Sequence, residues 1–207
     1  MKYDRFNFEN KLMGVLRGYD FEETLFAITS AYKAGMDVFE VALRYGKETQ
    51  DLITISALKK TLPDNIILGA GTVLGVDLLD KAVHAGADFI VSPVTEPAVI
   101  TKCLGYGIPC IPGACTPTEI YNAYKCGATL VKLFPANELG PKYLKSVKQP
   151  MPQIPIIAMG GITPQNIAQF SNAGAAAFGI SSGIFRKEEI KARNESAIIN
   201  RIKAYSF

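Results

Sequence analysis

Histidine and tryptophan are nearly missing from this chain. Its 207 residues include one histidine, His84, and no tryptophan. Histidine is the commonest general base and a frequent metal ligand, and a single copy leaves no cluster with the spacing of a zinc site. His84 lies in a helix-end context, where we expect a surface or capping role. Any chemistry in this protein is therefore expected to depend on lysine and carboxylate side chains.

Long apolar runs, paired cysteines and clustered basic residues are also missing. No apolar stretch reaches the roughly 20 residues that span a bilayer, and the charged N-terminus does not resemble a signal peptide. A net charge of +3 is spread along the chain, which gives no basic face for nucleic acid or a membrane. We therefore expect a cytoplasmic protein with neither partner. The cysteines form no CxxC pair, and we expect four small core residues: Cys103, Cys110, Cys115 and Cys126.

The chain is rich in one repeated theme, a short apolar run followed by an amphipathic stretch. Eight runs have the length and the β-branched content of buried strands: 12–17, 37–43, 65–70, 88–92, 108–112, 129–134, 154–159 and 175–180. Four helical segments stop at a glycine typical of a left-handed cap, within 33–37, 84–88, 125–129 and 172–176. Eight such units predict an α/β fold, a single-domain (β/α)8 TIM barrel over residues 1–207. A short helix at residues 3–10 is expected to close one end, and an open doubly wound sheet is the alternative.

A lysine interrupts the sixth predicted strand, TLVKLFPA at residues 129–136. Lys132 has apolar neighbours on both sides, and burial lowers the pKa of a lysine toward the neutral amine. A neutral amine is a nucleophile. The alternative is an edge strand or a snorkelling side chain whose ammonium reaches water.

A carboxylate interrupts the second predicted strand. Side chains alternate between the faces of a strand, so Glu40 shares a face with Val38 and Ala42, and Arg44 extends that row. A buried amine with a carboxylate nearby is the minimum equipment for forming a Schiff base with a ketone. The alternative is a structural ion pair between Glu40 and Arg44.

Small residues follow the last two predicted strands. Gly160 and Gly161 come after the seventh strand, before a helix expected to begin with Thr163 as its cap, and Ser181 and Ser182 come after the eighth. Small residues let backbone N–H groups approach an anion, and the loops after these strands often bind phosphate in such barrels. Tight turns without a ligand are the alternative.

The chain resembles the 2-keto-3-deoxy-6-phosphogluconate and 4-hydroxy-2-oxoglutarate aldolases. The shared motifs run in order along the chain: VLRG (15–18), FEVALR (39–44), GAGTVL (69–74), SPVTEP (92–97), IPG (111–113), VKLFPA (131–136) and GGITPQN (160–166). The resemblance implies a class I aldolase that needs no metal and no cofactor, and that is commonly a homotrimer.

The resemblance also implies roles for individual residues. Lys132 matches the Schiff-base lysine and Glu40 the glutamate that moves protons. Arg44 and Thr72 match residues that hold the substrate carboxylate, and Pro93 matches a residue lining the same pocket. The phosphate site is matched by Gly160, Gly161 and Ser182, with the backbone of Ser181 as a further donor.

Substrate choice is where the chain departs from this pattern. Tyr45 replaces a small hydroxyl residue at the expected pocket rim, and Met159 replaces a threonine before the glycine pair. Relatives without the strand-two arginine can use one at the end of the first strand, where this chain has Arg17, so either Arg17 or Arg44 can take the carboxylate.

The expected reaction cleaves a 2-keto-3-deoxy-6-phospho sugar acid to pyruvate and glyceraldehyde 3-phosphate. The alternatives are the galactonate epimer, unphosphorylated 4-hydroxy-2-oxoglutarate, and a barrel that binds a sugar phosphate without catalysis.

Overall fold

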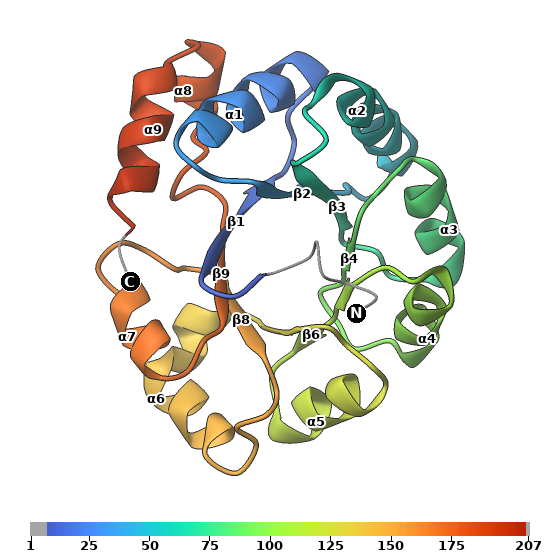
Figure 1. Cartoon of the computed structure of the whole chain (residues 1–207), viewed down its shortest axis with the longest axis vertical. Helices are drawn as coiled ribbons and strands as arrows, with labels where there is room; N and C mark the ends of the chain where they lie inside the picture. The colour runs from blue at the N-terminus through green and yellow to red at the C-terminus, as the bar shows by residue number, and fades with distance from the viewer. Residues whose placement is uncertain (1–7, 206–207) are drawn as a thin grey trace.

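The computed structural model describes residues 8–205, which form a ring of strands inside a ring of helices (Figure 1). The strands are β1 (Lys11–Leu16), β2 (Val38–Ala42), β3 (Ile67–Gly71), β4 (Ile90–Val91), β5 (Cys110–Ile111), β6 (Gly113–Ala114), β7 (Val131–Leu133), β8 (Ile156–Met159) and β9 (Ala177–Ile180). The helices are α1 (Phe21–Lys33), α2 (Glu48–Thr61), α3 (Val76–His84), α4 (Pro97–Tyr106), α5 (Pro117–Lys125), α6 (Ala136–Lys148), α7 (Ile167–Asn172), α8 (Lys187–Lys191) and α9 (Glu195–Lys203).

The strands are all parallel, in the order β5-β4-β3-β2-β1-β9-β8-β7-β6. The two ends of this order, β5 and β6, are consecutive in the chain and separated by Pro112 alone. The N–H of Ser92 donates to the Ile111 carbonyl at 3.1 Å on one side, and the N–H of Lys132 donates to the Pro112 carbonyl at 2.8 Å on the other. The predicted barrel is therefore confirmed, and the open sheet is wrong.

One predicted strand is divided in two, and most of the others are shorter than predicted. Residues 108–112 were expected to form a single fifth strand, but the structure has two short segments on either side of Pro112. Proline has no N–H to donate to a ladder, so the pairing with β4 ends before Pro112 and the pairing with β7 begins after it. The two segments together fill the fifth place in the barrel.

The four glycine stops have the predicted backbone conformation. Gly35, Gly86, Gly127 and Gly174 have φ values of 93°, 93°, 101° and 96°. The residue after each glycine donates its N–H five positions back, which is the Schellman pattern: Met36 to Ala31, Ala87 to Ala82, Ala128 to Ala123 and Ala175 to Phe170. Each of these helices therefore ends sharply, before a strand begins.

The helix expected at residues 3–10 lies mostly outside the described residues. From Phe8 the chain runs through a turn into β1. The Phe8 ring is 4% exposed and meets the Phe89 ring edge-on, with the ring centres 5.5 Å apart. Phe8 therefore fills part of the barrel interior.

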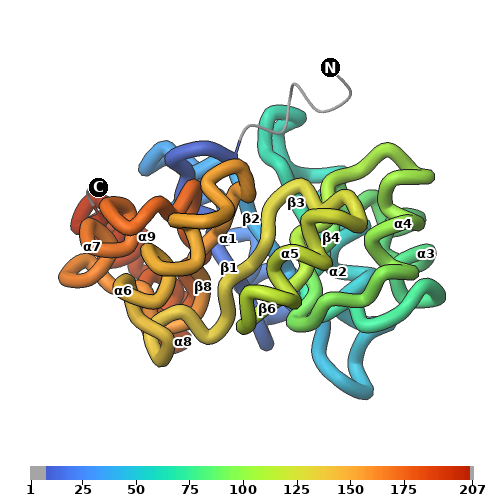
Figure 2. The backbone as a smooth tube through the Cα atoms, turned by 90° about the horizontal axis from the view of Figure 1, so that it is seen from below, coloured from blue at the N-terminus to red at the C-terminus, as the bar shows by residue number. Residues whose placement is uncertain are grey.

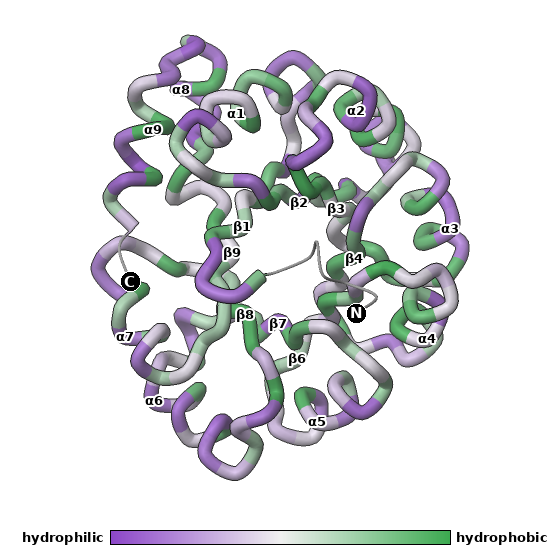
Figure 3. The backbone as a smooth tube through the Cα atoms, in the orientation of Figure 1, coloured by the Kyte–Doolittle hydropathy of each residue, from purple (hydrophilic) through white to green (hydrophobic). Residues whose placement is uncertain are grey.

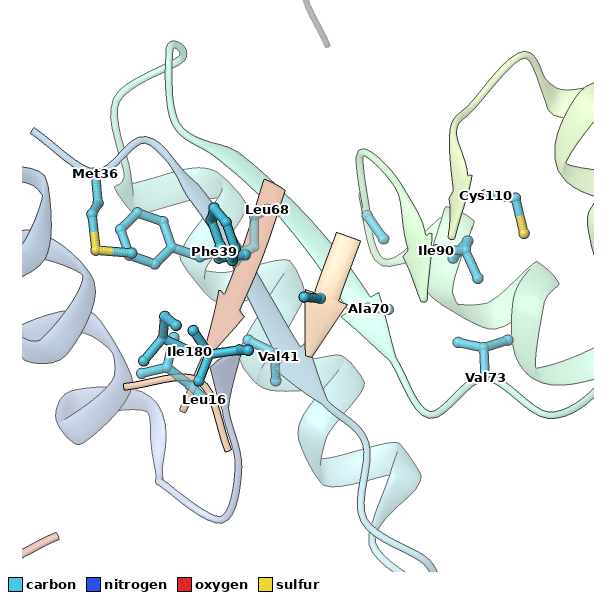
Figure 4. Close-up of a cluster of buried hydrophobic side chains, with 14 of the residues drawn as sticks. Leu16, Met36, Phe39, Val41, Leu68, Ala70, Val73, Ile90, Cys110 and Ile180 are labelled. Carbon is cyan, nitrogen blue, oxygen red and sulfur yellow. The ribbon is translucent and has the colours of Figure 1, made fainter. Parts of the chain in front are cut away.

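Two apolar layers hold the barrel together. The larger layer lies between the strands and the helices and contains Phe39 and Val41 (Figure 4). The smaller layer fills the barrel interior and contains Val38 and Met13. Figure 3 shows the strands mostly in hydrophobic colours, while hydrophilic stretches lie on the outer helices. Because β2 alternates between the layers, Glu40, placed between Phe39 and Val41, points into the barrel interior.

The side view in Figure 2 has β1 and β3 near its centre, with α6, α7 and α9 on one side and α3 and α4 on the other.

Within residues 8–205, no helix combines the length and the apolar composition needed to cross a membrane. The four cysteines are free thiols, as expected, although only Cys103 and Cys110 are fully buried. His84 ends α3, also as expected, with its ring Nδ1 2.7 Å from the Asp80 carbonyl.

Candidate active site

A cavity of about 700 Å³ opens at the end of the barrel where the strands terminate. Its walls contain nine of the ten residues predicted for the site: Arg17, Glu40, Thr72, Pro93, Lys132, Gly160, Gly161, Ser181 and Ser182. Arg44 is not among the lining residues. The sequence therefore predicted most of one cavity from residues on seven different strands or the loops after them.

Lys132 is held in the cavity by β7. Its side chain is buried, with 9% of the residue exposed, so it does not snorkel to the outer surface. Desolvation lowers the pKa of Lys132, the positive charge of Arg17 lowers it further, and the negative charge of Glu40 opposes them. The Phe134 ring covers the amine, with its centre 4.8 Å from Nζ. This environment favours the uncharged, nucleophilic amine.

Glu40 enters the same cavity from β2 and is 2% exposed. Desolvation raises the pKa of its carboxyl, against the opposing charges of Lys132 and Arg17. Its Oε2 atom has no hydrogen-bond partner among the described residues. A buried carboxylate oxygen without a partner is costly, and here it faces a cavity in which a substrate or water can supply the missing bond.

A glycine makes room for this carboxylate. Gly71 ends β3 beside Ala42, and a Cβ atom at Gly71 would overlap the Glu40 carboxylate. Any side chain at this position would push Glu40 away from Lys132. The second glycine of the GAGTV motif, Gly71, therefore leaves the space that the Glu40 side chain occupies.

Arg44 binds a partner that the sequence analysis missed. Its Nη2 and Nε donate to the Asp51 carboxylate at 2.5 and 3.1 Å, and its backbone N–H donates to the same group at 2.8 Å. Asp51 lies in the first turn of α2 and is 3% exposed. The alternative ion pair between Glu40 and Arg44 is therefore absent. An acidic residue in the first turn of the helix that follows the strand was the sequence signal for this pairing.

Arg17 is the arginine that enters the cavity. It follows β1, and its Nη2 donates to Thr72 Oγ1 at 3.0 Å. Thr72 itself has a φ of 63°, a left-handed conformation that costs a β-branched residue about 1–2 kcal/mol. Two backbone bonds hold it there, from Leu43 to the Gly71 carbonyl at 3.0 Å and from Val73 to the Val91 carbonyl at 3.2 Å. The strained threonine thus presents its hydroxyl beside a guanidinium.

The loop after β8 has two consecutive left-handed glycines. Gly160 and Gly161 have φ values of 91° and 74°. Asn166 fixes the loop: its Oδ1 accepts from the Thr163 N–H at 2.8 Å, and its Nδ2 donates to the Gly161 carbonyl at 2.9 Å. The prediction of Thr163 as the cap was wrong in detail, because α7 begins only at Ile167 and the bonding side chain is that of Asn166.

The loop after β9 is joined to the loop after β8 by a tyrosine. A Cβ atom at Gly183 would overlap the Tyr205 hydroxyl, and that hydroxyl donates to the Ile162 carbonyl at 3.4 Å. The Ser181 carbonyl also accepts the N–H groups of Ile184 and Phe185, at 3.0 and 2.9 Å. The two small-residue loops therefore form one connected wall.

Three further positions complete the description. Arg186 lines the cavity, although the sequence analysis gave it no role. Met159 lies in the wall, 4% exposed, and packs against Gly179. Tyr45 was expected at the pocket rim, but it is fully exposed and lies outside the cavity lining.

Within residues 8–205, no three His, Cys, Asp or Glu side chains are grouped as metal ligands.

The fold and cavity define a parallel (β/α)8 barrel whose interior brings a desolvated amine near a buried carboxylate. A sequence model of the KDPG and KHG aldolases matches residues 5–202. The chain belongs to this family, and it is an aldolase.

Individual relatives agree with this assignment. The 2-dehydro-3-deoxy-6-phosphogalactonate aldolase of Escherichia coli K12 is 34% identical over 195 residues, 94% of each chain. The 2-dehydro-3-deoxy-phosphogluconate aldolase of Treponema pallidum is 41% identical over 117 residues, 56% of this chain and 55% of its own. The structure of the Legionella pneumophila KDPG aldolase, with pyruvate captured as a covalent carbinolamine, has a TM-score of 0.88 and 28% identity, covering 100% of this chain and 98% of its own.

Proposed function

We propose that this protein is a class I aldolase that cleaves a 2-keto-3-deoxy-6-phospho sugar acid through an imine on Lys132. The observation that carries the proposal is the placement of a buried amine and a buried carboxylate in the same cavity, with the pKa of Lys132 lowered and that of Glu40 raised. The carbinolamine captured in the Legionella relative supports the same chemistry. A Schiff base needs a free amine to attack and a group that can exchange protons.

The first half of the reaction forms the imine. Lys132 Nζ attacks the C2 ketone, and the resulting carbinolamine carries a hydroxyl at C2. The protonated Glu40 carboxyl, favoured by its raised pKa, gives a proton to that hydroxyl, which leaves as water. The nitrogen lone pair then forms the iminium. Arg17, bonded to Thr72, holds the substrate carboxylate beside C2.

The second half cleaves the carbon chain. The Glu40 carboxylate, acting through a water, removes the C4 hydroxyl proton, and the electrons of the C3–C4 bond move into the iminium. Glyceraldehyde 3-phosphate leaves, and Lys132 holds an enamine. Protonation at C3 restores the iminium, and addition of water releases pyruvate and the free amine. Each proton removed by Glu40 is available for the following step.

A second candidate substrate is the galactonate epimer. Arg44, the strand-two arginine, has its guanidinium bound to Asp51 outside the cavity. Arg17, in the cavity, matches the arginine of relatives that lack the strand-two arginine, and the Escherichia coli galactonate enzyme covers 94% of this chain. Comparing kcat/KM for the two C4 epimers tests this choice. A ratio above one for the galactonate epimer supports it, and a ratio below one supports the gluconate epimer.

Pyruvate and a phosphorylated keto acid are thus the small-molecule partners that we propose, together with a cytoplasmic location and a homotrimeric assembly. The resemblance supports the trimer. Apolar side chains after β3 and β4 give it structural support, because Leu74 and Val94 are 54% and 48% exposed. Cell fractionation tests the location, and recovery with the membrane pellet would contradict it.

Borohydride trapping tests the central chemistry. The protein is incubated with pyruvate and sodium borohydride, and peptide mass spectrometry locates the adduct. We expect it on Lys132 and expect Lys132→Ala to abolish it. Lys148 is an internal control, because burial also lowers its pKa but it bonds to the Pro152 and Ile154 carbonyls outside the cavity. An adduct on Lys148 alone, or none in folded protein, would contradict the imine mechanism.

A further inference from the structure

The cavity carries more positive charge than the imine chemistry uses. Its charged lining residues are three cations, Arg17, Lys132 and Arg186, and one acid, Glu40. Lys132 has the role of the attacking amine, and Arg17 is bonded to Thr72 at the side that takes the carboxylate. Arg186 has no role in the reaction described above. Its guanidinium lies at the mouth of the cavity, where it can bind a second anionic group of the substrate.

Arg186 also has no hydrogen-bond or ion-pair partner among the described residues. Of the five arginines in residues 8–205, it alone has a guanidinium without a hydrogen bond or an ion pair. The acid close by, Glu189, is taken by Arg201, whose Nη2 and Nε donate to its carboxylate at 2.6 and 2.9 Å. The hydrogen bond to Arg201 is the largest cause that lowers the pKa of Glu189, and the charge of Arg186 is the smallest. An unpaired guanidinium at a cavity mouth is suited to an incoming anion.

The backbone at Arg186 is fixed although its side chain is exposed. The two preceding residues, Ile184 and Phe185, are 0% and 2% exposed, and the Phe185 carbonyl accepts a hydrogen bond from the Tyr19 hydroxyl at 3.0 Å. Ile190, in α8, is also fully buried. Figure 1 shows α8 beside α1 and α9 in the outer ring. The backbone that carries the Arg186 side chain is therefore held in place at the rim of the cavity.

The position of Arg186 matches the phosphate end of the cavity. In the barrel, β1 neighbours β9, and β9 neighbours β8. Arg17 follows β1, Ser182 and Arg186 follow β9, and Gly161 follows β8. The anion loops and Arg186 therefore follow two neighbouring strands, β9 and β8, while the Thr72 hydroxyl that Arg17 contacts follows β3, on the far side of β1 and β2.

We propose that Arg186 binds the terminal phosphate of the substrate and gives the enzyme its preference for phosphorylated over unphosphorylated keto acids. This inference rests on the proposed aldolase function and extends it to a residue outside the matched motifs. Arginine presents a planar fork that pairs with two phosphate oxygens, whereas lysine offers a single point charge. Arg186 is exposed, so the contribution that we expect is to substrate binding and not to the chemical step.

The test compares Arg186→Gln and Arg186→Lys with the control Lys187→Gln. Lys187 is the next residue, is equally exposed, and lies outside the cavity lining, so it controls for the loss of one charge. Titration calorimetry measures glycerol 3-phosphate binding, and kinetics measure KM for the phosphorylated substrate and for 4-hydroxy-2-oxoglutarate. We expect Arg186→Gln to weaken glycerol 3-phosphate binding about tenfold or more and to raise KM for the phosphorylated substrate alone. Arg186→Lys is expected to recover part of both values.

The outcomes separate this proposal from the proposed function. An equal change in Arg186→Gln and Lys187→Gln, an equal rise in KM for both substrates, or no glycerol 3-phosphate binding in the unmodified protein would overturn the role of Arg186. None of these results affects pyruvate trapping on Lys132. Failure of pyruvate trapping with a selective loss of glycerol 3-phosphate binding in Arg186→Gln would contradict the aldolase mechanism and support Arg186 as a phosphate ligand.

Discussion

At the scale of single residues, the site contains two buried ionisable groups, and burial disfavours the charged form of each. Desolvation favours the neutral forms of Lys132 and Glu40, and the attraction between the two groups opposes it. A buried ion pair is costly to form without further hydrogen bonds, and Glu40 Oε2 has none among the described residues. In the mechanism that we propose, this carboxyl group supplies and removes the protons of imine formation.

The first prediction concerns Glu40→Gln. The glutamate charge raises the pKa of Lys132, so its removal is expected to lower that pKa further. The pH at which the amine becomes reactive should therefore move downward, while kcat falls about 10²–10⁴-fold because the proton-transfer group is gone. The rate of pyruvate trapping as a function of pH measures the first effect, and steady-state cleavage measures the second. An upward shift, or an unchanged kcat, would contradict the assigned role.

The second prediction compares the two arginines. We expect Arg17→Gln to raise KM for the keto acid about tenfold or more, because it removes a charged bond to the substrate carboxylate. Arg44→Gln loses its bonds to Asp51 outside the cavity and leaves a buried carboxylate without its cation, so its main effect should be on stability. Thermal unfolding and steady-state kinetics on both variants distinguish them. A larger rise in KM for Arg44→Gln would assign the carboxylate to Arg44.

At the scale of structural elements, the site is built from strand ends and from the loops that begin there. The loops after β8 and β9 are joined by the Tyr205 hydroxyl and braced by Asn166. A direct change at Gly161 is a poor test of anion binding, because a Cβ atom there would overlap Asn137. The supporting side chain gives a cleaner experiment.

The third prediction is therefore made for Asn166→Ala. The variant loses side-chain bonds to the Thr163 N–H and the Gly161 carbonyl, at a cost of about 1–2 kcal/mol in the free energy of unfolding. The loosened glycine loop should also raise KM for phosphorylated substrate more than KM for 4-hydroxy-2-oxoglutarate. Urea unfolding and kinetics with both substrates provide the measurements. Gln165→Ala is the control, because Gln165 is an exposed neighbour without a side-chain hydrogen bond to the described residues.

At the scale of the whole molecule, the mouth of the barrel has two chemically different sides. The small-residue loops and Arg186 lie after β8 and β9, whereas the exposed apolar side chains Leu74 and Val94 follow β3 and β4. Exposed apolar clusters commonly mark interfaces. The apolar side is the one that we assign to contacts between copies of the chain.

The fourth prediction concerns this assembly. Light scattering is expected to give three times the chain mass of 22.4 kDa. Val94→Asp should lower that mass, because it introduces a charge on the apolar side. Ile53→Asp is the control, since Ile53 is 58% exposed on α2, away from the mouth. A monomeric wild type, or equal behaviour of the two variants, would contradict the trimer or its assigned surface.

The sequence by itself determined the repeating units, their glycine stops and the two misplaced charges, Lys132 and Glu40. These features are local. A glycine cap depends on the φ of one residue, and a charged residue within an apolar run is visible in the sequence without knowing which residues surround it in space. The motif residues on most strands lie in one cavity because the carboxyl ends of the strands of such a barrel meet at one face.

Only the tertiary structure placed Arg17 in the cavity and Arg44 outside it, and only it gave Arg186 a place in the cavity. Both Arg17 and Arg44 follow a strand, so their local patterns are equivalent; Asp51, supplied by α2, binds one of them outside the cavity. The split of the fifth strand likewise depends on which neighbours pair on each side of Pro112. The placement of an arginine and the extent of a strand depend on partners that lie far away in the sequence or on another element. The energy of a charged or hydrogen-bonding group is set by the groups that surround it in space.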